Sequence, residues 1–308
     1  MVLRIERRGS DAGSRLFYGL MAIGICLYVI VGGELFCRYY LGLGTPPLSI
    51  AHPTIEYLFA PDQELSRFGN RIAYNHWSMR NEQISETNDT SQARIMVIGD
   101  SVVNGGSLSD HSNLATTILT DEKTLYMNVS AGSWGPANEL AYLQTFGFFD
   151  AKALIIVLSG HDASDLPTFA PLDPNILPQA RPWLALGEAV ERYLPRYVPG
   201  HTAKASALGK LPTRNIDLSP LKTMIELATG KGLSVCVILH HTKADRLSGT
   251  LNHGLAAIQS AAKAHGANVI DDKSFLDPET SYRDDIHVSN KGQGDLSLAL
   301  LDCLKASP

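Results

Sequence analysis

The stretch IMVIGDS at residues 95–101 decides the fold, because it joins an apolar run to a small polar turn. An unbroken run of mostly β-branched residues is typical of a strand buried on both faces of a parallel sheet. The run ends at Gly99, Asp100 and Ser101, which places the serine at the carboxyl edge of the sheet, where open α/β sheets bind ligands. Ser101 is therefore the candidate nucleophile. A turn in which Asp100 and Ser101 only bond local backbone is the alternative.

After residue 93, apolar strand-like runs alternate with helix-like segments. This alternation predicts a three-layer α/β/α, flavodoxin-like parallel sheet of about five strands with helices on both faces. The expected strands are residues 94–98, 124–129, 153–158, 233–239 and 267–270. The expected helices are residues 114–119, 136–146, 221–229, 251–265 and 290–305.

A long insertion, residues 166–219, separates the third expected strand from the helix that follows it. It is rich in proline, and residues 184–193 form the one part of it that we expect to be a short helix. A long irregular segment beside the carboxyl edge of a sheet indicates a lid or a wall of a substrate pocket. A surface excursion without function is the alternative.

The N-terminal region predicts a membrane anchor. Residues 1–15 carry four arginines, and residues 16–33 carry no charge, which is enough to cross about 30 Å of hydrocarbon as a helix. We expect a cytoplasmic N-terminus at 1–15, a transmembrane anchor at 16–36, a membrane-proximal spacer at 37–92 that packs loosely, and a main domain at 93–308. This predicts a single-pass protein of the inner membrane with a periplasmic main domain. A cleaved signal peptide is the alternative, although no clear small-x-small site follows the run.

The composition bears on nucleic-acid binding, on metal binding and on the state of the cysteines. The formal net charge is -5, the pI is near 6.0 and no long basic run occurs, which argues against nucleic-acid binding. None of the four cysteines has metal-ligand spacing. Cys236 and Cys303 are expected to be buried thiols, with a disulfide between them as the alternative in an extracytoplasmic domain.

Asp284 and His287 supply a candidate base for Ser101. They lie three positions apart in an expected loop before the last helix. This spacing lets the carboxylate bond one imidazole nitrogen while the other nitrogen faces a serine hydroxyl. A turn with helix capping is the alternative for the pair alone.

Other polar residues follow the remaining strand ends. Gly132 follows the second strand, His161 and Asp162 the third, and His240 and His241 the fourth. The three histidines could form a zinc cluster, but no carboxylate spacing supports one and a serine nucleophile needs no metal, so we expect no metal. Asp162, His240 and His241 are expected to line a substrate pocket or cap the strand edge.

Taken together, residues 93–308 resemble a GDSL-type esterase of the SGNH hydrolase superfamily. Gly99-Asp100-Ser101 is similar to the first block of that family, Ala131-Gly132 with Gly135 to the second, and Asp284-x-x-His287 with Asn290-Lys291-Gly292 to the last. The resemblance implies Ser101 as nucleophile, His287 as base and Asp284 as its orienting carboxylate. It also implies an oxyanion hole from the N–H groups of Ser101 and Gly132.

The third block departs from the family, which has Gly-x-Asn-Asp with an asparagine that donates to the oxyanion. Here the chain reads Leu158-Ser159-Gly160-His161-Asp162, and His161 takes the place of the asparagine. An imidazole N–H can donate as well, so we expect His161 to complete the oxyanion hole.

Asn75-x-x-x-Met79-Arg80 resembles the Asn-x-x-Gly-x-Arg stretch of membrane-anchored bacterial members, with the glycine missing. Such members accompany exopolysaccharide or cell-wall synthesis. The resemblance implies an esterase or O-acyltransferase that works through an acyl-serine without a cofactor, on short acyl groups such as O-acetyl of extracytoplasmic polysaccharide. A lipid esterase or lysophospholipase, and a non-catalytic polysaccharide-assembly subunit, are the alternatives. The oligomeric state stays open.

Overall fold

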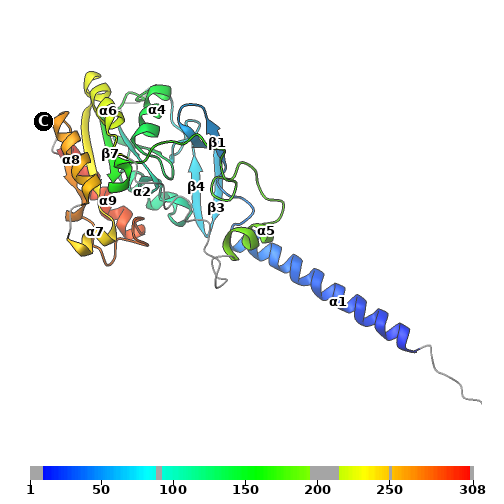
Figure 1. Ribbon diagram of the computed structural model, residues 1–308. Coiled ribbons are helices and arrows are strands. Elements are labelled where there is room, and N and C mark those ends of the chain that lie inside the picture. The colour runs from blue at the N-terminus through cyan, green and yellow to red at the C-terminus, as the bar shows by residue number, and fades with distance from the viewer. Residues whose placement is uncertain (1–9, 88–91, 195–214, 250–251, 306–308) are drawn as a thin grey trace, which may run out of the picture.

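The computed structural model describes residues 10–87, 92–194, 215–249 and 252–305. A long helix, α1 (Ser10–Leu35), projects away from the rest of the chain and continues into a π-helical turn, η1 (Phe36–Tyr40) (Figure 1). Within it, Gly13–Tyr40 is long and apolar enough to cross a membrane, with a mean hydropathy of 2.2 and 6% of its most apolar window buried. The expected N-terminal apolar helix is thus confirmed. Its length and composition fit both a membrane span and a signal sequence.

Five parallel strands form the central sheet in the order β6-β5-β7-β8-β9. The first strand of this sheet in chain order, β5, therefore lies between the second, β6, and the third, β7, which is the flavodoxin-like order. The predicted α/β fold is confirmed. The strands are β5 (Ala93–Gly99), β6 (Thr124–Ser130), β7 (Ala153–Ser159), β8 (Ser234–His240) and β9 (Asn268–Asp271).

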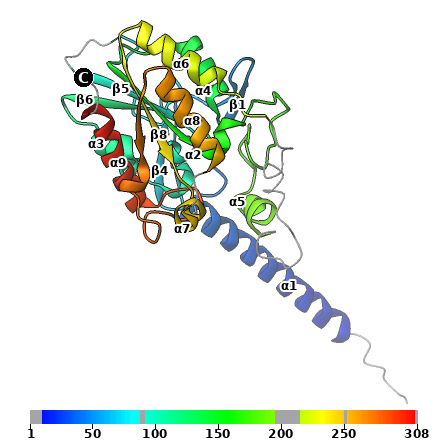
Figure 2. The same ribbon diagram turned by 60° about the vertical axis from the view of Figure 1, so that its left-hand side comes forward.

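Helices cover both faces of the sheet, and the strand residues alternate between the two cores. On β5, Met96 and Ile98 pack with α4 (Pro136–Phe146), α6 (Ser219–Gly230) and α8 (His253–Ala264). Ile95 and Val97 pack on the opposite face with α3 (Ala115–Leu119) and α9 (Asn290–Lys305). Figure 2 shows α8 and α9 on opposite sides of β8. Two-sided burial explains why these strands read as continuous apolar runs.

The helix expected at residues 251–265 is α8, and a separate helix, α7 (Lys243–Ser248), precedes it. Gly249 ends α7 in the left-handed conformation, and the Asn252 side chain accepts a hydrogen bond from the Gly254 N–H at the start of α8. Short helical segments complete the described chain: α2 (Ser101–Asn104), η2 (Gly106–Leu108), η3 (His111–Asn113), η4 (Gly160–Ala163), α5 (Ala185–Glu188), η5 (Ala189–Tyr193) and η8 (Asp272–Ser274).

The prediction that residues 37–92 pack loosely is wrong. They form two antiparallel hairpins, β1 (Ser49–His52) with β2 (Glu56–Phe59) and β3 (Gln63–Arg67) with β4 (Asn70–Tyr74). Tyr57, Leu58 and Met79 are buried in the same core as α4 and α6. The segment is therefore part of the main domain, because burial of its apolar side chains in that core is favourable.

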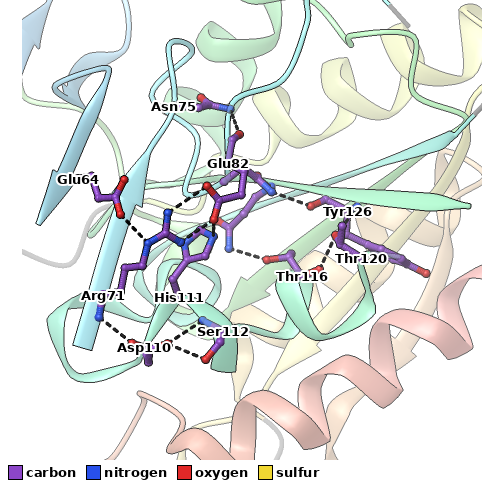
Figure 3. A network of polar contacts seen from close by, with 12 residues as sticks. Glu64, Arg71, Asn75, Glu82, Asp110, His111, Ser112, Thr116, Thr120 and Tyr126 are labelled. Atoms are coloured by element: carbon purple, nitrogen blue, oxygen red, sulfur yellow. Dashed lines mark hydrogen bonds and ion pairs between the residues drawn. The ribbon is translucent and has the colours of Figure 1, made fainter. Parts of the chain in front are cut away.

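A polar network ties the second hairpin to the loop that follows α2 (Figure 3). The Arg71 side chain donates to Glu64 at 2.7 Å and to Glu82 at 2.5 Å. The backbone N–H of Arg71 donates to Asp110 at 2.6 Å, and His111 Nε2 lies 3.3 Å from the Glu82 carboxylate. Polar groups from three parts of the chain thus meet at the loop that follows α2.

The Asn75–Arg80 turn shows what replaces the glycine of the resembled motif. The Asn75 side-chain oxygen accepts the N–H groups of Trp77 and Met79, both at 3.0 Å. Ser78 stands where the motif has glycine, and its φ is 59°, in the left-handed region that favours glycine. The serine thus keeps the conformation of the turn, which carries Arg80 into the protein interior.

Cys236 of β8 and Cys303 of α9 form a disulfide across one core. The structure therefore supports the alternative to buried free thiols. A disulfide of this kind persists in an oxidising compartment.

Candidate active site

Ser101 lies where β5 ends at the carboxyl edge of the sheet. Asp100 caps α2 by accepting the Val102 N–H at 2.8 Å, and Ser101 is the first residue of this helix. Gly99 leaves no room for a side chain, because a Cβ there would lie 2.7 Å from Val103 and 3.0 Å from the Val157 carbonyl. The strand and helix therefore approach closely, which fixes the direction in which Ser101 leaves the sheet.

Ser101, predicted from the strand end, and His287 and Asp284, predicted from their spacing, are joined by hydrogen bonds. His287 Nε2 lies 3.0 Å from Ser101 Oγ, and His287 Nδ1 lies 2.9 Å and 3.0 Å from the two Asp284 oxygens. Burial raises the pKa of Asp284, but the backbone N–H and ring of His287 and the Ile286 N–H outweigh it, and the pKa is lowered. An ionised Asp284 holds the proton of the neutral imidazole on Nδ1, which leaves Nε2 free to accept the serine proton.

The end of β8 holds the loop that carries His287. His240 Nδ1 lies 2.5 Å from Asp272, and His240 Nε2 lies 2.8 Å from the carbonyl of Ile286, the residue before His287. Burial disfavours the charged ring, but the Asp272 carboxylate and the Ile286 carbonyl raise the pKa of His240 to about 9. His240 is therefore an imidazolium at neutral pH and donates through both nitrogens.

The contact between His240 and Asp272 predicts that the stability of the fold depends on pH. Because the pKa of His240 is raised from 6.5 to about 9, its contribution is complete below pH 6.5 and is lost as the pH rises through about 9. We expect the free energy of unfolding to fall by about 3 kcal/mol across this range. Urea denaturation at several pH values measures the fall. The double variant His240→Gln/Asp272→Asn lacks the titrating group and should lose this component, whereas an identical pH profile in both proteins would contradict the assignment.

The residues expected to line a pocket lie beneath the surface instead. Asp162 and His240 have no exposed surface, and His241 is 5% exposed. Asp162 accepts the Ser159 N–H at 2.6 Å, and His241 Nε2 lies 3.0 Å from Asp271. These side chains stabilise the strand ends, because each is occupied by a partner within the fold.

The alternative of a zinc cluster at His161, His240 and His241 is not supported among the described residues. Two groups of three ligand atoms do gather there, Asp100-His161-Asp162 and His241-Asp271-Asp272. Neither group contains two of the three histidines.

His161, just after β7, lies close to two buried carboxylates, those of Asp162 and Asp100. Its Nε2 lies 3.1 Å from Asp162 and 3.7 Å from Asp100, and 46% of its side chain is exposed. Burial and the neighbouring Asp100 raise the pKa of Asp162. While Nε2 of His161 bonds these carboxylates, Nδ1 is the ring nitrogen left to donate a hydrogen bond to an oxyanion.

A further carboxyl group, Glu139 of α4, was missed by the sequence reasoning. It has no exposed surface, and neither of its oxygens has a hydrogen-bond partner within the described structure. Burial, with Asp162 and Asp100 nearby, raises the pKa of Glu139 well above its usual range. No sequence signal separates it from the acidic residues common in first turns of helices.

Two arginines hold the loop after α2. Arg80 donates to the Ser109 carbonyl at 3.1 Å and packs over the Tyr74 ring, 5.3 Å from its centre. Arg283, which precedes Asp284, donates to the Gly105 carbonyl at 3.0 Å. Both residues lie outside the predicted site. The motif ending in Arg80 was the signal for the first of them.

Tyr57 of the first hairpin also reaches this region. Its hydroxyl donates to the carbonyl of Gly132, in the loop after β6. The loop is thereby fixed by a segment that precedes it by 75 positions. The role of the Ser101 and Gly132 N–H groups in an oxyanion hole stays a prediction.

A cavity of about 160 Å³ lies beside the loop that follows α2. Gly106 and Ser107 form its wall on that side, and both hairpins and the insertion contribute to the rest. The insertion thus lines a cavity, but Ser101, Asp284 and His287 are not among the lining residues, and its role as a lid or a substrate wall stays a prediction. Other lining residues are Phe59, Arg67, Tyr74, Ile176, Arg192 and Tyr193.

Neither a family model nor a curated protein matches the chain. Similar solved structures include a member of the lipolytic G-D-S-L family from Veillonella parvula, with 16% identity and a TM-score of 0.41 over 70% of this chain and 99% of that one. An inhibitor-bound aryl esterase from M. smegmatis has 17% identity and a TM-score of 0.41 over 70% and 100% of the two chains.

Another similar structure is Est24, a carbohydrate acetylesterase from Sinorhizobium meliloti, with 13% identity and a TM-score of 0.39 over 70% of this chain and 99% of that one. GDSL-type hydrolases are thus among the structural neighbours. With identities this low and TM-scores below 0.5, these likenesses do not place the chain in a family. The case for a function comes from the geometry around Ser101.

Proposed function

We propose that this chain is a serine esterase that forms an acyl-enzyme on Ser101. The observation that carries the proposal is the unbroken hydrogen-bond chain from Ser101 Oγ through His287 to Asp284. A serine hydroxyl is a weak nucleophile, and it becomes effective when an adjacent imidazole takes its proton as it attacks. Catalytic sites of this type are identified by geometry and roles.

In the proposed reaction, Ser101 Oγ attacks the ester carbonyl while His287 Nε2 takes its proton. The resulting oxyanion is stabilised by the N–H groups of Ser101 and Gly132 and by His161. His287 then gives the proton to the departing alcohol, and the acyl group stays on Ser101. Water, activated by His287, releases the acid and restores the serine. A sugar hydroxyl in place of this water would make the same site an O-acyltransferase.

For the substrate, we propose short acyl esters, such as O-acetyl groups, on an extracytoplasmic polysaccharide. The cavity beside the loop that follows α2 has aromatic side chains from Phe59, Tyr74 and Tyr193, which suit the apolar faces of sugar rings. The Cys236–Cys303 disulfide and the apolar helix α1 favour a main domain outside the cytoplasm. A lipid esterase is the second candidate, because exposed apolar side chains lie beside α1.

Acyl-chain preference separates these two candidates. The full-length chain in lipid nanodiscs should hydrolyse p-nitrophenyl acetate faster than the laurate or palmitate ester, and should release acetate from an O-acetylated polysaccharide. A higher kcat/KM for long chains would favour the lipid esterase. Labelling by a fluorophosphonate, located on Ser101 by peptide mass, would establish the nucleophile in either case. A folded protein that neither turns over any ester nor takes the label would exclude both.

A further inference from the structure

Six large apolar side chains are exposed around the point where α1 meets the main domain. We call this set the collar. Trp183 is 96% exposed, Tyr39 80% and Tyr40 73%. Water-exposed side chains of this size, gathered in one place, indicate a surface that has a partner. The collar consists of Tyr39, Tyr40, Trp183, Leu184, Val190 and Leu194.

The collar has one part in η1, which contains Tyr39 and Tyr40, and another in the insertion, which contains Trp183. Direct contacts join these two parts. The Glu34 carboxylate, at the end of α1, accepts the backbone N–H groups of Ala185 at 3.1 Å and Leu186 at 2.9 Å. Arg38 of η1 donates to the carbonyl of Trp183 at 3.3 Å and pairs with Glu34. Figure 1 shows α5 beside the end of α1 that joins the domain. The insertion is thus hydrogen-bonded to the end of α1 that joins the domain.

The insertion turns only one side toward the protein. Ala185 and Glu188 are buried, and Glu188 forms an ion pair with the buried Arg67. Trp183 precedes α5, Val190 lies in η5 and Leu194 follows it, and all three side chains are exposed. The protein core therefore does not cover these apolar side chains.

The position of the collar along α1 identifies its partner. The uncharged part of α1 ends before Glu34, and Arg38 follows in η1, so a bilayer that α1 spans has its outer headgroup region at this level. Tryptophan and tyrosine concentrate at this depth, where an apolar ring and a polar edge are both accommodated. Arg181, two positions before Trp183, is exposed and supplies a cation for lipid phosphates.

We propose that the collar inserts into the headgroup region of the same bilayer that α1 spans, so that the insertion is a second membrane contact of the domain. The inference rests on a membrane-spanning α1 and is independent of catalysis by Ser101. Arg192 and Tyr193 of η5 line the cavity beside the loop that follows α2, so the element that contacts lipid also forms a wall of this cavity.

Tryptophan fluorescence of the full chain in nanodiscs tests the proposal. Three tryptophans are present, and Trp183 is the exposed one, since Trp134 is 1% exposed and Trp77 is half-buried. The difference between the wild type and Trp183→Phe gives the Trp183 emission. We expect lipids brominated near the glycerol end of the acyl chains to remove most of this emission, and aqueous iodide to remove little of it.

A matched control places a tryptophan on an exposed helix far from α1. Leu298 on α9 is 52% exposed, and Leu298→Trp in the Trp183→Phe background should be quenched by iodide and unaffected by brominated lipid. Iodide quenching of Trp183 without lipid quenching would overturn the proposal. Protection from both quenchers would also overturn it, because the collar would then be buried against a second copy. Ester hydrolysis in the same samples reports on the active site separately.

Discussion

Ser101→Ala is expected to lower kcat for p-nitrophenyl acetate by about 10³-fold or more, to the rate of the buffer. The substitution removes the oxygen that lies 3.0 Å from His287 Nε2, and the structure offers that imidazole no other hydroxyl among the described contacts. Because Ser101 lies at the start of α2 and the Asp100 cap remains, the fold should persist. Initial rates, together with circular dichroism of both proteins, measure the effect.

Ser260→Ala is the matched control for this variant. Ser260 is exposed on α8, and its hydroxyl only donates to the Ala256 carbonyl at 2.9 Å. Its removal should leave the rate unchanged. If Ser101→Ala kept wild-type turnover while its fold was intact, the acyl-enzyme mechanism would be wrong, and the hydrogen-bond chain to Asp284 would have only a structural role.

Removing the disulfide is expected to have the largest effect on stability. The bond closes a loop with a sequence separation of 67, which corresponds to about 4 kcal/mol of loop-closure entropy in the unfolded chain. Domains are commonly stable by only about 5–15 kcal/mol, so this is a substantial part of the total. We expect Cys236→Ala/Cys303→Ala to unfold at a markedly lower urea concentration than the wild type.

Reductant provides the control for the disulfide variant. Dithiothreitol present during unfolding should shift the wild-type urea midpoint toward that of Cys236→Ala/Cys303→Ala and leave the variant unmoved. A wild-type midpoint that ignores reductant, with two alkylatable thiols at these positions in the native protein, would show that the pair is not bonded.

Local sequence was sufficient wherever one segment carries its own determinants. The buried strand before Ser101 shows as a β-branched run, and Asp284 and His287 meet because three positions in a turn bring them together. These features need no knowledge of distant segments. The sheet follows from the same kind of signal, repeated along the chain.

The missed features depend on contacts between distant segments. His240 supports the Ile286 carbonyl 46 positions away, and the Tyr57 hydroxyl reaches Gly132 across 75 positions. Neither contact leaves a spacing or a period in the sequence. Ser78 illustrates the other difficulty, because a non-glycine residue in the left-handed region carries no sequence signal of its conformation.

The hydrogen bond between Ser101 and His287 joins residues 186 positions apart, and the disulfide to α9 closes still later in the sequence. During synthesis, the serine therefore emerges from the ribosome long before the histidine. A partly synthesised chain has Ser101 without the imidazole that its hydroxyl contacts. The order of residues along the chain thus delays assembly of the hydrogen-bond chain until the loop before α9 has been made, and the disulfide that joins α9 to the sheet can form only after that.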